Sequence, residues 1–232
     1  MGREAAHFSL KDNFFLVEVR VVGTKELWHN IRPEVEVMDK APYRTLIPLF
    51  EELRGPRVTI RAYREADAQD LFDAVAESRD HLRPWLPFAD NHQTIEESLD
   101  WIIQQQAAWL LRKNMNMAVC ENDSPGRYLG GVGLHPHDWD VGHFEIGYWL
   151  RKSAEGHGYM AEAVSLLTNY ALNDLKANRV EILCDALNTR SAAVARRLGF
   201  VHEGTLRNDS LQHGGGGIRS THVFSRIPSD PV

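Results

Sequence analysis

The segment from residue 143 to residue 171 constrains the fold of this chain most, because its hydrophobic pattern changes period at a glycine turn. His143–Leu150 alternates apolar and polar side chains, as a half-buried strand does. Gly156 and Gly158 follow, and from Met160 to Ala171 apolar residues recur at helical spacing. A strand, turn and helix in this order direct backbone N–H groups and the positive helix end at one place, a geometry that binds phosphate.

The glycine turn matches neither common nucleotide-binding motif. It lacks the third glycine of a dinucleotide-binding fingerprint, because Tyr159 and Met160 follow Gly158, and it lacks the Gly-Lys-Ser/Thr ending of a Walker loop. By itself the turn therefore fits either another phosphate-containing ligand or an ordinary tight turn.

The remaining hydrophobic pattern predicts a mixed α/β domain. Strand-like patterns occupy residues 58–61, 115–121, 127–135, 143–150, 180–185, 200–207 and 218–227, and helices are predicted from 67, over 94–110, from 160 and over 188–198. The order is β-α-α-β-β-β-α-β-α-β-β, and its three successive strands predict an antiparallel meander. Thr94-Ile-Glu-Glu97 predicts a capping box, followed by a buried stripe of Leu99, Ile102, Ile103 and Leu110.

Composition excludes several classes of protein. With 43% apolar and 25% charged residues the chain can bury a core, which argues against intrinsic disorder. No apolar run approaches the roughly 20 residues of a membrane span, so we expect no membrane partner. The two cysteines lack C-x-x-C spacing and the first residues lack an apolar signal region, so reduced thiols and a cytoplasmic location are expected. Acidic residues outnumber basic ones between 56 and 150, which disfavours nucleic acid.

The chain divides into an N-terminal extension, residues 1–47, and a main domain, residues 48–232. The extension contains one strand-like run, Phe14–Val22, and then a polar stretch interrupted by Pro33 and Pro42. We expect residues 14–22 to add a strand to a sheet edge, either in the same subunit or in the partner of a homodimer.

Four sequence blocks in a fixed order carry a resemblance to a known family. They are Arg57–Arg61 with Asp67, Leu82–Pro87, Glu145–Leu150 with the glycine turn, and Asn188–Phe200 followed by Glu203-Gly204. Together they resemble the GNAT superfamily of N-acetyltransferases, and within it the RimJ/RimL-type acetyltransferases of ribosomal protein N-termini. The resemblance covers about residues 48–227. It implies an α/β fold with a mixed, mostly antiparallel sheet whose central strands splay apart between flanking helices, and acetyl-CoA as co-substrate.

The resemblance also implies where acetyl-CoA binds. Pantetheine contacts would come from the backbone of Trp149 and Leu150, and the opening between the splayed strands would hold the pantetheine arm like an extra strand. The pyrophosphate would lie on the amides of Gly156, His157, Gly158, Tyr159 and Met160, with Asn188 and Arg196 on the other side. The family usually has Gln or Arg where this chain has Ser153, which we expect to weaken binding modestly, because the amides supply most of the contacts.

Acetyl transfer to an amine needs a base, because an amine is protonated near neutral pH, and it is helped by an acid for the departing thiolate. Glu145 is the candidate base, acting through water as in many GNAT enzymes; the alternative is a glutamate on a solvated strand face. Ala195 stands where many members have an acidic tyrosine, so Ser191 is the candidate acid; its alternative role is helix capping beside Asn188. Cys184 is expected to be a buried structural thiol.

The acceptor site is less defined by the sequence. Trp85 is a candidate for the acceptor pocket, with Asp90 or Asp209 attracting the amine. His135, His137 and His143 flank one loop but are interpreted as surface histidines, and the reaction needs no metal. The function expected is direct acetyl transfer to a primary amine, most simply a protein N-terminal α-amine. The alternatives are a small-molecule amine, such as a polyamine or aminoglycoside, and a non-catalytic module that binds acyl-CoA.

Overall fold

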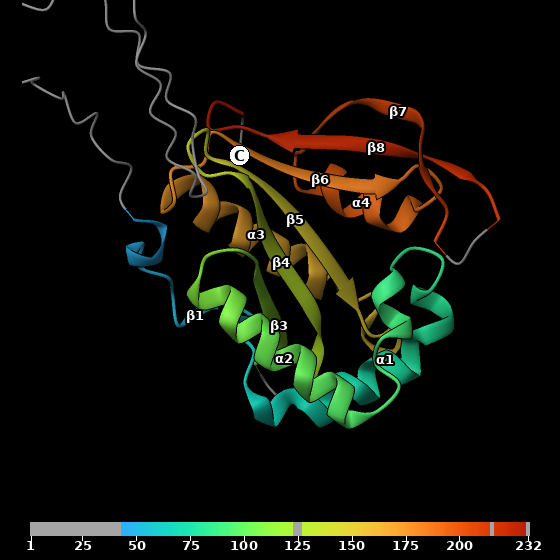
Figure 1. The fold of residues 1–232 in the computed structure, drawn as a ribbon. Coiled ribbons are helices and arrows are strands. Elements are labelled where there is room, and N and C mark those ends of the chain that lie inside the picture. The colour runs from blue at the N-terminus through green and yellow to red at the C-terminus, as the bar shows by residue number, and fades with distance from the viewer. Residues whose placement is uncertain (1–42, 123–126, 214–215, 231–232) are drawn as a thin grey trace, which may run out of the picture. The chain divides into compact units, whose positions relative to one another are not determined.

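The computed structural model describes residues 43–122, 127–213 and 216–230. The expected strand at 14–22, and the extension before residue 43, lie outside the described residues. All elements below belong to the unit that comprises residues 41–232 (Figure 1).

The described residues form eight strands, four α-helices and four short 3-10 helices. The strands are β1 (Glu52–Arg54), β2 (Val58–Ala62), β3 (Met115–Glu121), β4 (Tyr128–Asp138), β5 (His143–Leu150), β6 (Arg179–Asp185), β7 (Val201–Leu211) and β8 (Ile218–Arg226). The helices are α1 (Ala68–Leu82), α2 (Ile95–Leu110), α3 (Tyr159–Asn173) and α4 (Thr189–Arg197). The 3-10 helices are η2 (Arg44–Leu46), η3 (Glu65–Asp67), η4 (Pro87–Asp90) and η5 (Lys152–Ala154).

All eight strands form one sheet in the order β1-β2-β3-β4-β5-β6-β8-β7. Every neighbouring pair is antiparallel except β5 and β6, which are parallel. The predicted meander is therefore confirmed as β3-β4-β5. Helices α1 and α2 pack over one face of the sheet, and α3 and α4 over the other, so the domain has three layers (Figure 1).

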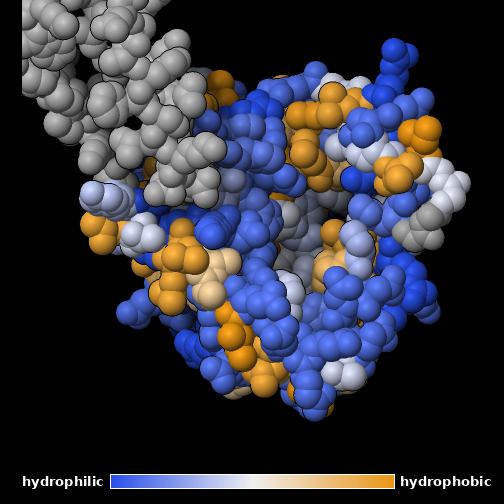
Figure 2. Space-filling model, in the orientation of Figure 1, coloured by the Kyte–Doolittle hydropathy of each residue, from blue (hydrophilic) through white to orange (hydrophobic). Residues whose placement is uncertain are grey.

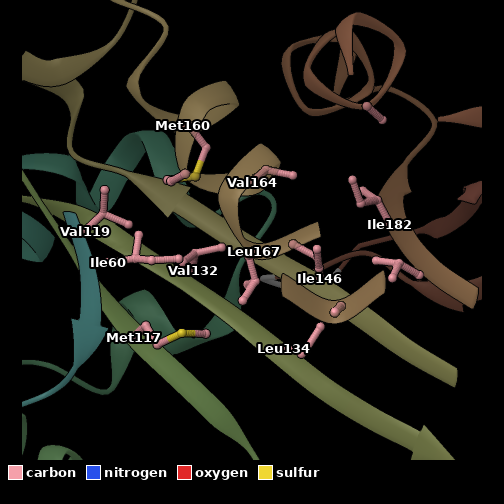
Figure 3. Close-up of a cluster of buried hydrophobic side chains, with 14 of the residues drawn as sticks. Ile60, Met117, Val119, Val132, Leu134, Ile146, Met160, Val164, Leu167 and Ile182 are labelled. Atoms are coloured by element: carbon pink, nitrogen blue, oxygen red, sulfur yellow. The ribbon is translucent and has the colours of Figure 1, made fainter. Parts of the chain in front are cut away.

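Two clusters of buried side chains correspond to the two faces of the sheet. The larger cluster packs Val164 and Leu167 of α3 against Ile60, Val132 and Ile146 of the central strands (Figure 3). The smaller cluster joins the apolar residues of α1 and α2 to Tyr128 and Trp149 on the opposite face. Because neighbouring residues of a strand point to opposite faces, Ile146 and Trp149 contribute to different clusters, as the alternation in the sequence predicts.

The parallel pair β5–β6 is short, and this creates the opening in the sheet. Only three residue pairs are in register: His143 with Arg179, Phe144 with Val180, and Glu145 with Glu181. Beyond them the strands separate, whereas β5 stays paired with β4 from His143 to Leu150. The splay expected from the family resemblance is thus confirmed.

Two details of the predicted elements were wrong or missing. Ile103 and Leu110 of α2 are 47% and 66% exposed, whereas Ile102 is fully buried, because α2 covers the sheet with a face narrower than its apolar stripe. Trp101 packs edge-on against Tyr63 instead, with ring centroids 5.1 Å apart. Strand β1 was not predicted. Its three residues are mostly polar and too few to show a periodic pattern, and only their pairing with β2 identifies them as a strand.

Candidate active site

A cavity of about 850 Å³ lies where β5 and β6 separate. Its walls come from the open edges of β5 and β6, the beginning of α3, one face of α4, the end of α1 with the residues after it, and the β7–β8 hairpin. Figure 2 shows its mouth as a hollow in the surface, between the part over α1 and the part over β6 and β8. The predicted residues that line it are Glu145, Trp149, Leu150, Gly156, Gly158, Tyr159, Met160, Asn188, Ser191 and Trp85.

Gly156 and Gly158 give the turn between β5 and α3 its shape. Their φ angles are 81° and 79°, in the left-handed region that residues with a Cβ avoid. A Cβ on Gly156 would meet no atom within 4 Å, so this part of the turn borders open space. Gly158 is the N-cap of α3 and provides no side-chain cap, which leaves the first-turn N–H groups available to an anion. These residues fit a diphosphate.

Arg57 fixes this turn from the loop between β1 and β2. Its guanidinium donates to the Glu162 carboxylate at 2.8 Å and to the carbonyl oxygen of His157 at 2.6 Å. Glu162 also accepts from the backbone N–H groups of Arg57 and Val58. Burial opposes the ionisation of Glu162, but these hydrogen bonds outweigh it and lower the pKa of its carboxyl. The start of α3 is therefore held against the edge of the sheet before any ligand binds.

Two predicted residues are not in the cavity lining. His157 lies between Gly156 and Gly158 and borders a neighbouring depression that both glycines also line, and the guanidinium of Arg196 lies 5.4 Å from the centre of the Phe224 ring. Arg190 and Arg197 of the same helix line the cavity instead. The sequence shows several arginines in 188–198, but only the orientation of α4 decides which of them face the ligand.

Glu145 lies at the last paired position of β5 and β6, at the closed end of the opening. Its Oε2 is 3.1 Å from Nε2 of His137, and the side chain is partly exposed. A carboxylate at this place borders both the cavity and solvent, which suits a group that exchanges protons through water. Its partner in register, Glu181, and the neighbouring His137 were not predicted as site residues.

Ser191 lies on the first turn of α4, opposite Tyr148 of β5. The Tyr148 hydroxyl donates to the carbonyl oxygen of Ser191 at 3.0 Å and is 2.9 Å from its Oγ. Burial raises the pKa of Tyr148, so this phenol is protonated at neutral pH. Asn188 caps α4 by accepting the Ser191 N–H at 3.1 Å. The sequence analysis did not predict Tyr148 as a site residue. Its position near the end of the strand before the glycine turn was visible in the sequence, but its contact with Ser191 was not.

Cys184 of β6 also lines the cavity, close to Ser191. It is buried, as expected, and burial raises the pKa of its thiol. A protonated thiol is a poor nucleophile, which agrees with a structural role.

The expected acceptor residues divide into two groups. Trp85 and Asp209 line the cavity, whereas Asp90 lies outside the lining and binds Arg83 at 2.8 Å. Trp149 also lines the cavity, and its buried ring packs beside Phe88, with ring centroids 5.4 Å apart.

Comparison with protein families and sequences gives consistent matches. Residues 57–201 match the acetyltransferase (GNAT) domain family. The chain is 32% identical over 157 residues to the protein named "Putative ribosomal N-acetyltransferase YdaF" of Bacillus subtilis (strain 168), a match that covers 68% of this chain and 85% of that protein. It is 25% identical over 186 residues to the ribosomal protein uS5-alanine N-acetyltransferase of Escherichia coli (strain K12), covering 74% and 89% of the two chains.

Solved structures share the fold. The RimL ribosomal alpha-N-protein acetyltransferase in complex with coenzyme A superposes with a TM-score of 0.70 at 21% identity, over 76% of this chain and 98% of that one. The microcin C7 self-immunity acetyltransferase MccE, in complex with acetyl-CoA and AMP, gives a TM-score of 0.68 at 21% identity, over 75% and 93%. None of the helices within the described residues has the length and apolar character needed to cross a membrane.

Proposed function

The chain belongs to the GNAT family of acetyl-CoA-dependent N-acetyltransferases, and from this premise we propose that it acetylates the α-amine at the N-terminus of a protein. The observation that carries the proposal is the opening between β5 and β6, which joins Glu145 at its closed end to the glycine turn. The extended pantetheine arm of acetyl-CoA can enter such an opening and bind the free strand edges, as a peptide does when it adds to a sheet.

The residues present suit acetyl-CoA. The amides after Gly156 and Gly158 would hold its pyrophosphate, and Arg190 and Arg197 provide positive charge in the same cavity. The backbone of Trp149 and Leu150 would pair with the pantetheine arm. When bound, acetyl-CoA supplies an acetyl thioester, which is the acyl donor.

The chain's own residues would move two protons. The carboxylate of Glu145 accepts one from the ammonium group of the acceptor, through a water molecule, and so frees the lone pair of the nitrogen. The hydroxyl of Ser191 donates one to the departing sulfur. Ser191 then regains a proton from water, and Tyr148, which burial keeps protonated, holds the Ser191 side chain in place with its hydroxyl 2.9 Å from Ser191 Oγ. A thiolate is a good leaving group, because a thiol is a much stronger acid than an alcohol, so we expect the base to matter more than the acid.

The acceptor is the finer part of the proposal. Glu145, Asp185 and Asp209 line the cavity and favour a cationic amine of any kind, whereas Glu155 is paired with Arg190 at 2.8 Å. The names of the relatives favour a protein, since the B. subtilis relative and the E. coli alanine acetyltransferase are both named for ribosomal substrates. A polyamine or aminoglycoside is the second candidate, supported by the same acidic lining.

The test is a panel of acceptors with the full chain and acetyl-CoA, and acetylated product is measured by mass spectrometry. The panel holds short peptides with free N-terminal Ser or Ala, the same peptides with a blocked N-terminus and one internal lysine, polyamines and aminoglycosides. We expect product only from free N-termini. Product from polyamines or aminoglycosides alone would show that the acceptor is a small-molecule amine and not a protein N-terminus. Binding of CoA in a calorimetric titration without product from any amine would favour the binding module.

A further inference from the structure

We propose that His137, Glu145 and Glu181 form a Zn²⁺ site at the closed end of the opening between β5 and β6. One atom from each side chain can act as a ligand, and these three atoms all lie within 4.8 Å of one another. Nε2 of His137 is 3.1 Å from a Glu145 oxygen and 3.4 Å from a Glu181 oxygen. Bonds of 2.0–2.2 Å to a tetrahedral zinc ion place neighbouring ligand atoms about 3.3–3.6 Å apart, so two of the three separations are already close to those needed.

Three different strands bring the ligands together. Glu145 of β5 and Glu181 of β6 are the last residue pair in register before the strands separate. His137 lies in β4, where the register with β5 shifts between Pro136 and Asp138, so it is the extra residue of a bulge. Bulges commonly redirect a side chain next to a functional site. The fold, and not a local motif, therefore assembles the cluster.

The charges of the cluster favour a divalent cation. Two carboxylates face each other on adjacent strands, an arrangement that destabilises a sheet unless positive charge lies nearby, and Arg179 offsets the charge of Glu181 but does not contact Glu145. Glu181 is only 9% exposed in its side chain, so water screens this repulsion poorly. A zinc ion with two carboxylates and one neutral imidazole has no net charge.

Neighbouring groups orient Glu181 for this role. Arg179 donates to Oε2 of Glu181 from Nε at 3.1 Å and from Nη2 at 2.9 Å, and Nε2 of His143 lies 3.1 Å from the same oxygen without a hydrogen bond to it. These contacts use one carboxylate oxygen and leave the other, Oε1, turned toward His137. The rings of His143 and His137 are stacked, with centroids 4.8 Å apart. Residues that hold a ligand in this way raise metal affinity.

Binding of zinc would inhibit the enzyme, and this consequence rests on the proposed function. Glu145 cannot accept a proton from the acceptor amine while its carboxylate is bound to the ion. Three protein ligands leave the fourth position of the ion open to water, and Glu145 is the one of the three that also lines the cavity. Zinc would therefore act as a reversible inhibitor, because it occupies the carboxylate of Glu145 that would otherwise accept the proton.

The first test measures Zn²⁺ binding to the full chain by calorimetry, against a chelator of known affinity. We expect one site, weakened at least 10-fold in His137→Ala and in Glu181→Gln. The change His143→Ala removes the ring stacked on His137 and should weaken binding less than the loss of a ligand does. His202→Ala, which alters a histidine pair on the β7–β8 hairpin, is the matched control and should bind zinc as the wild type does.

Three results would overturn the site: no zinc binding by the wild type, equal affinity in the wild type and His137→Ala, or a loss caused by Cys184→Ser alone, which would assign the ion to the thiol. Circular dichroism confirms that each variant is folded. His137 is exposed, so its replacement keeps the test decisive if Glu181→Gln fails to fold.

The second test measures acetylated product by mass spectrometry while Zn²⁺ is varied. Each variant is compared with its own zinc-free rate. We expect inhibition that EDTA reverses, and at least a 10-fold higher inhibitory concentration for His137→Ala. Equal inhibition of both proteins would refute the inhibitory role. If no amine is acetylated, the proposed function fails while the calorimetric test still decides the metal site.

Discussion

The two edges of strand β5 differ in how far each is paired with a neighbouring strand. Along one edge β5 pairs with β4 from His143 to Leu150, and along the other it pairs with β6 only as far as Glu145. Along the closed edge the backbone groups of β5 form hydrogen bonds with β4, and side chains of both strands contribute to the buried clusters on the two faces of the sheet. The open edge leaves backbone groups for a ligand and borders the cavity. One strand thus serves stability on one side and binding on the other, and substitutions on it should separate these two roles.

Replacement of a core residue on the paired part of β5 should have the largest effect. Phe144 is 1% exposed and packs edge-on against Trp139, with ring centroids 4.9 Å apart. Phe144→Ala removes these contacts and leaves a cavity, so we expect the free energy of unfolding to fall by about 3–5 kcal/mol. Urea denaturation measures the loss, and a decrease in the unfolding free energy below about 1 kcal/mol would show that the paired part of β5 contributes little to stability.

The next residue should behave differently. Glu145→Gln keeps the size of the side chain and removes the proposed base, so kcat should fall by at least about 100-fold at neutral pH. The unfolding free energy should change by less than about 1 kcal/mol, because Glu145 is partly exposed. Steady-state kinetics and urea denaturation of the same sample test both statements. Unchanged turnover would remove Glu145 from the mechanism.

Ser191 lies across the opening and should matter less. The change Ser191→Ala removes the proposed proton donor but keeps the backbone N–H that Asn188 accepts. We expect kcat to fall about 10-fold, less than for Glu145, because a thiolate is a good leaving group. Tyr148→Phe is the companion variant, since it removes the hydroxyl 2.9 Å from Ser191 Oγ. A loss of CoA affinity in place of turnover would instead assign Ser191 to binding.

The glycine turn is expected to affect cofactor affinity and to leave turnover unchanged. Gly156 has a φ of 81°, and a Cβ there meets no other atom, so Gly156→Ala should cost only backbone strain of about 1–2 kcal/mol. A free turn that relaxes to avoid this strain must adopt it again when CoA binds, which should weaken CoA binding by up to about 5–30-fold in a calorimetric titration. Gly204→Ala is the matched control, because its Cβ is equally unhindered and no left-handed φ is involved. Equal affinities for the two variants would show that the turn does not hold the ligand.

The sequence predicted most elements because their signals are local. The period of the apolar residues located the helices and seven of the eight strands. Thr94 caps α2 through the Glu97 N–H as expected, but the return bond of the predicted capping box differs, because the Glu97 carboxylate accepts from the Gln93 N–H. The prediction was weaker where burial depends on a partner element. Ile103 fits the apolar stripe of α2 but is exposed, because only the packing of α2 on the sheet defines which part of the stripe is covered.

The sequence by itself determined that Glu145 stands on a strand, that two glycines precede a helix, and that Asn188 begins another. Each of these depends on residues a few positions apart. Only the tertiary structure decided that His137 and Glu181 lie beside Glu145, that Tyr148 contacts Ser191, and that Arg190 faces the cavity where Arg196 does not. Those contacts join segments separated by many residues, and their geometry follows from strand register, a bulge and helix orientation, which no local pattern encodes.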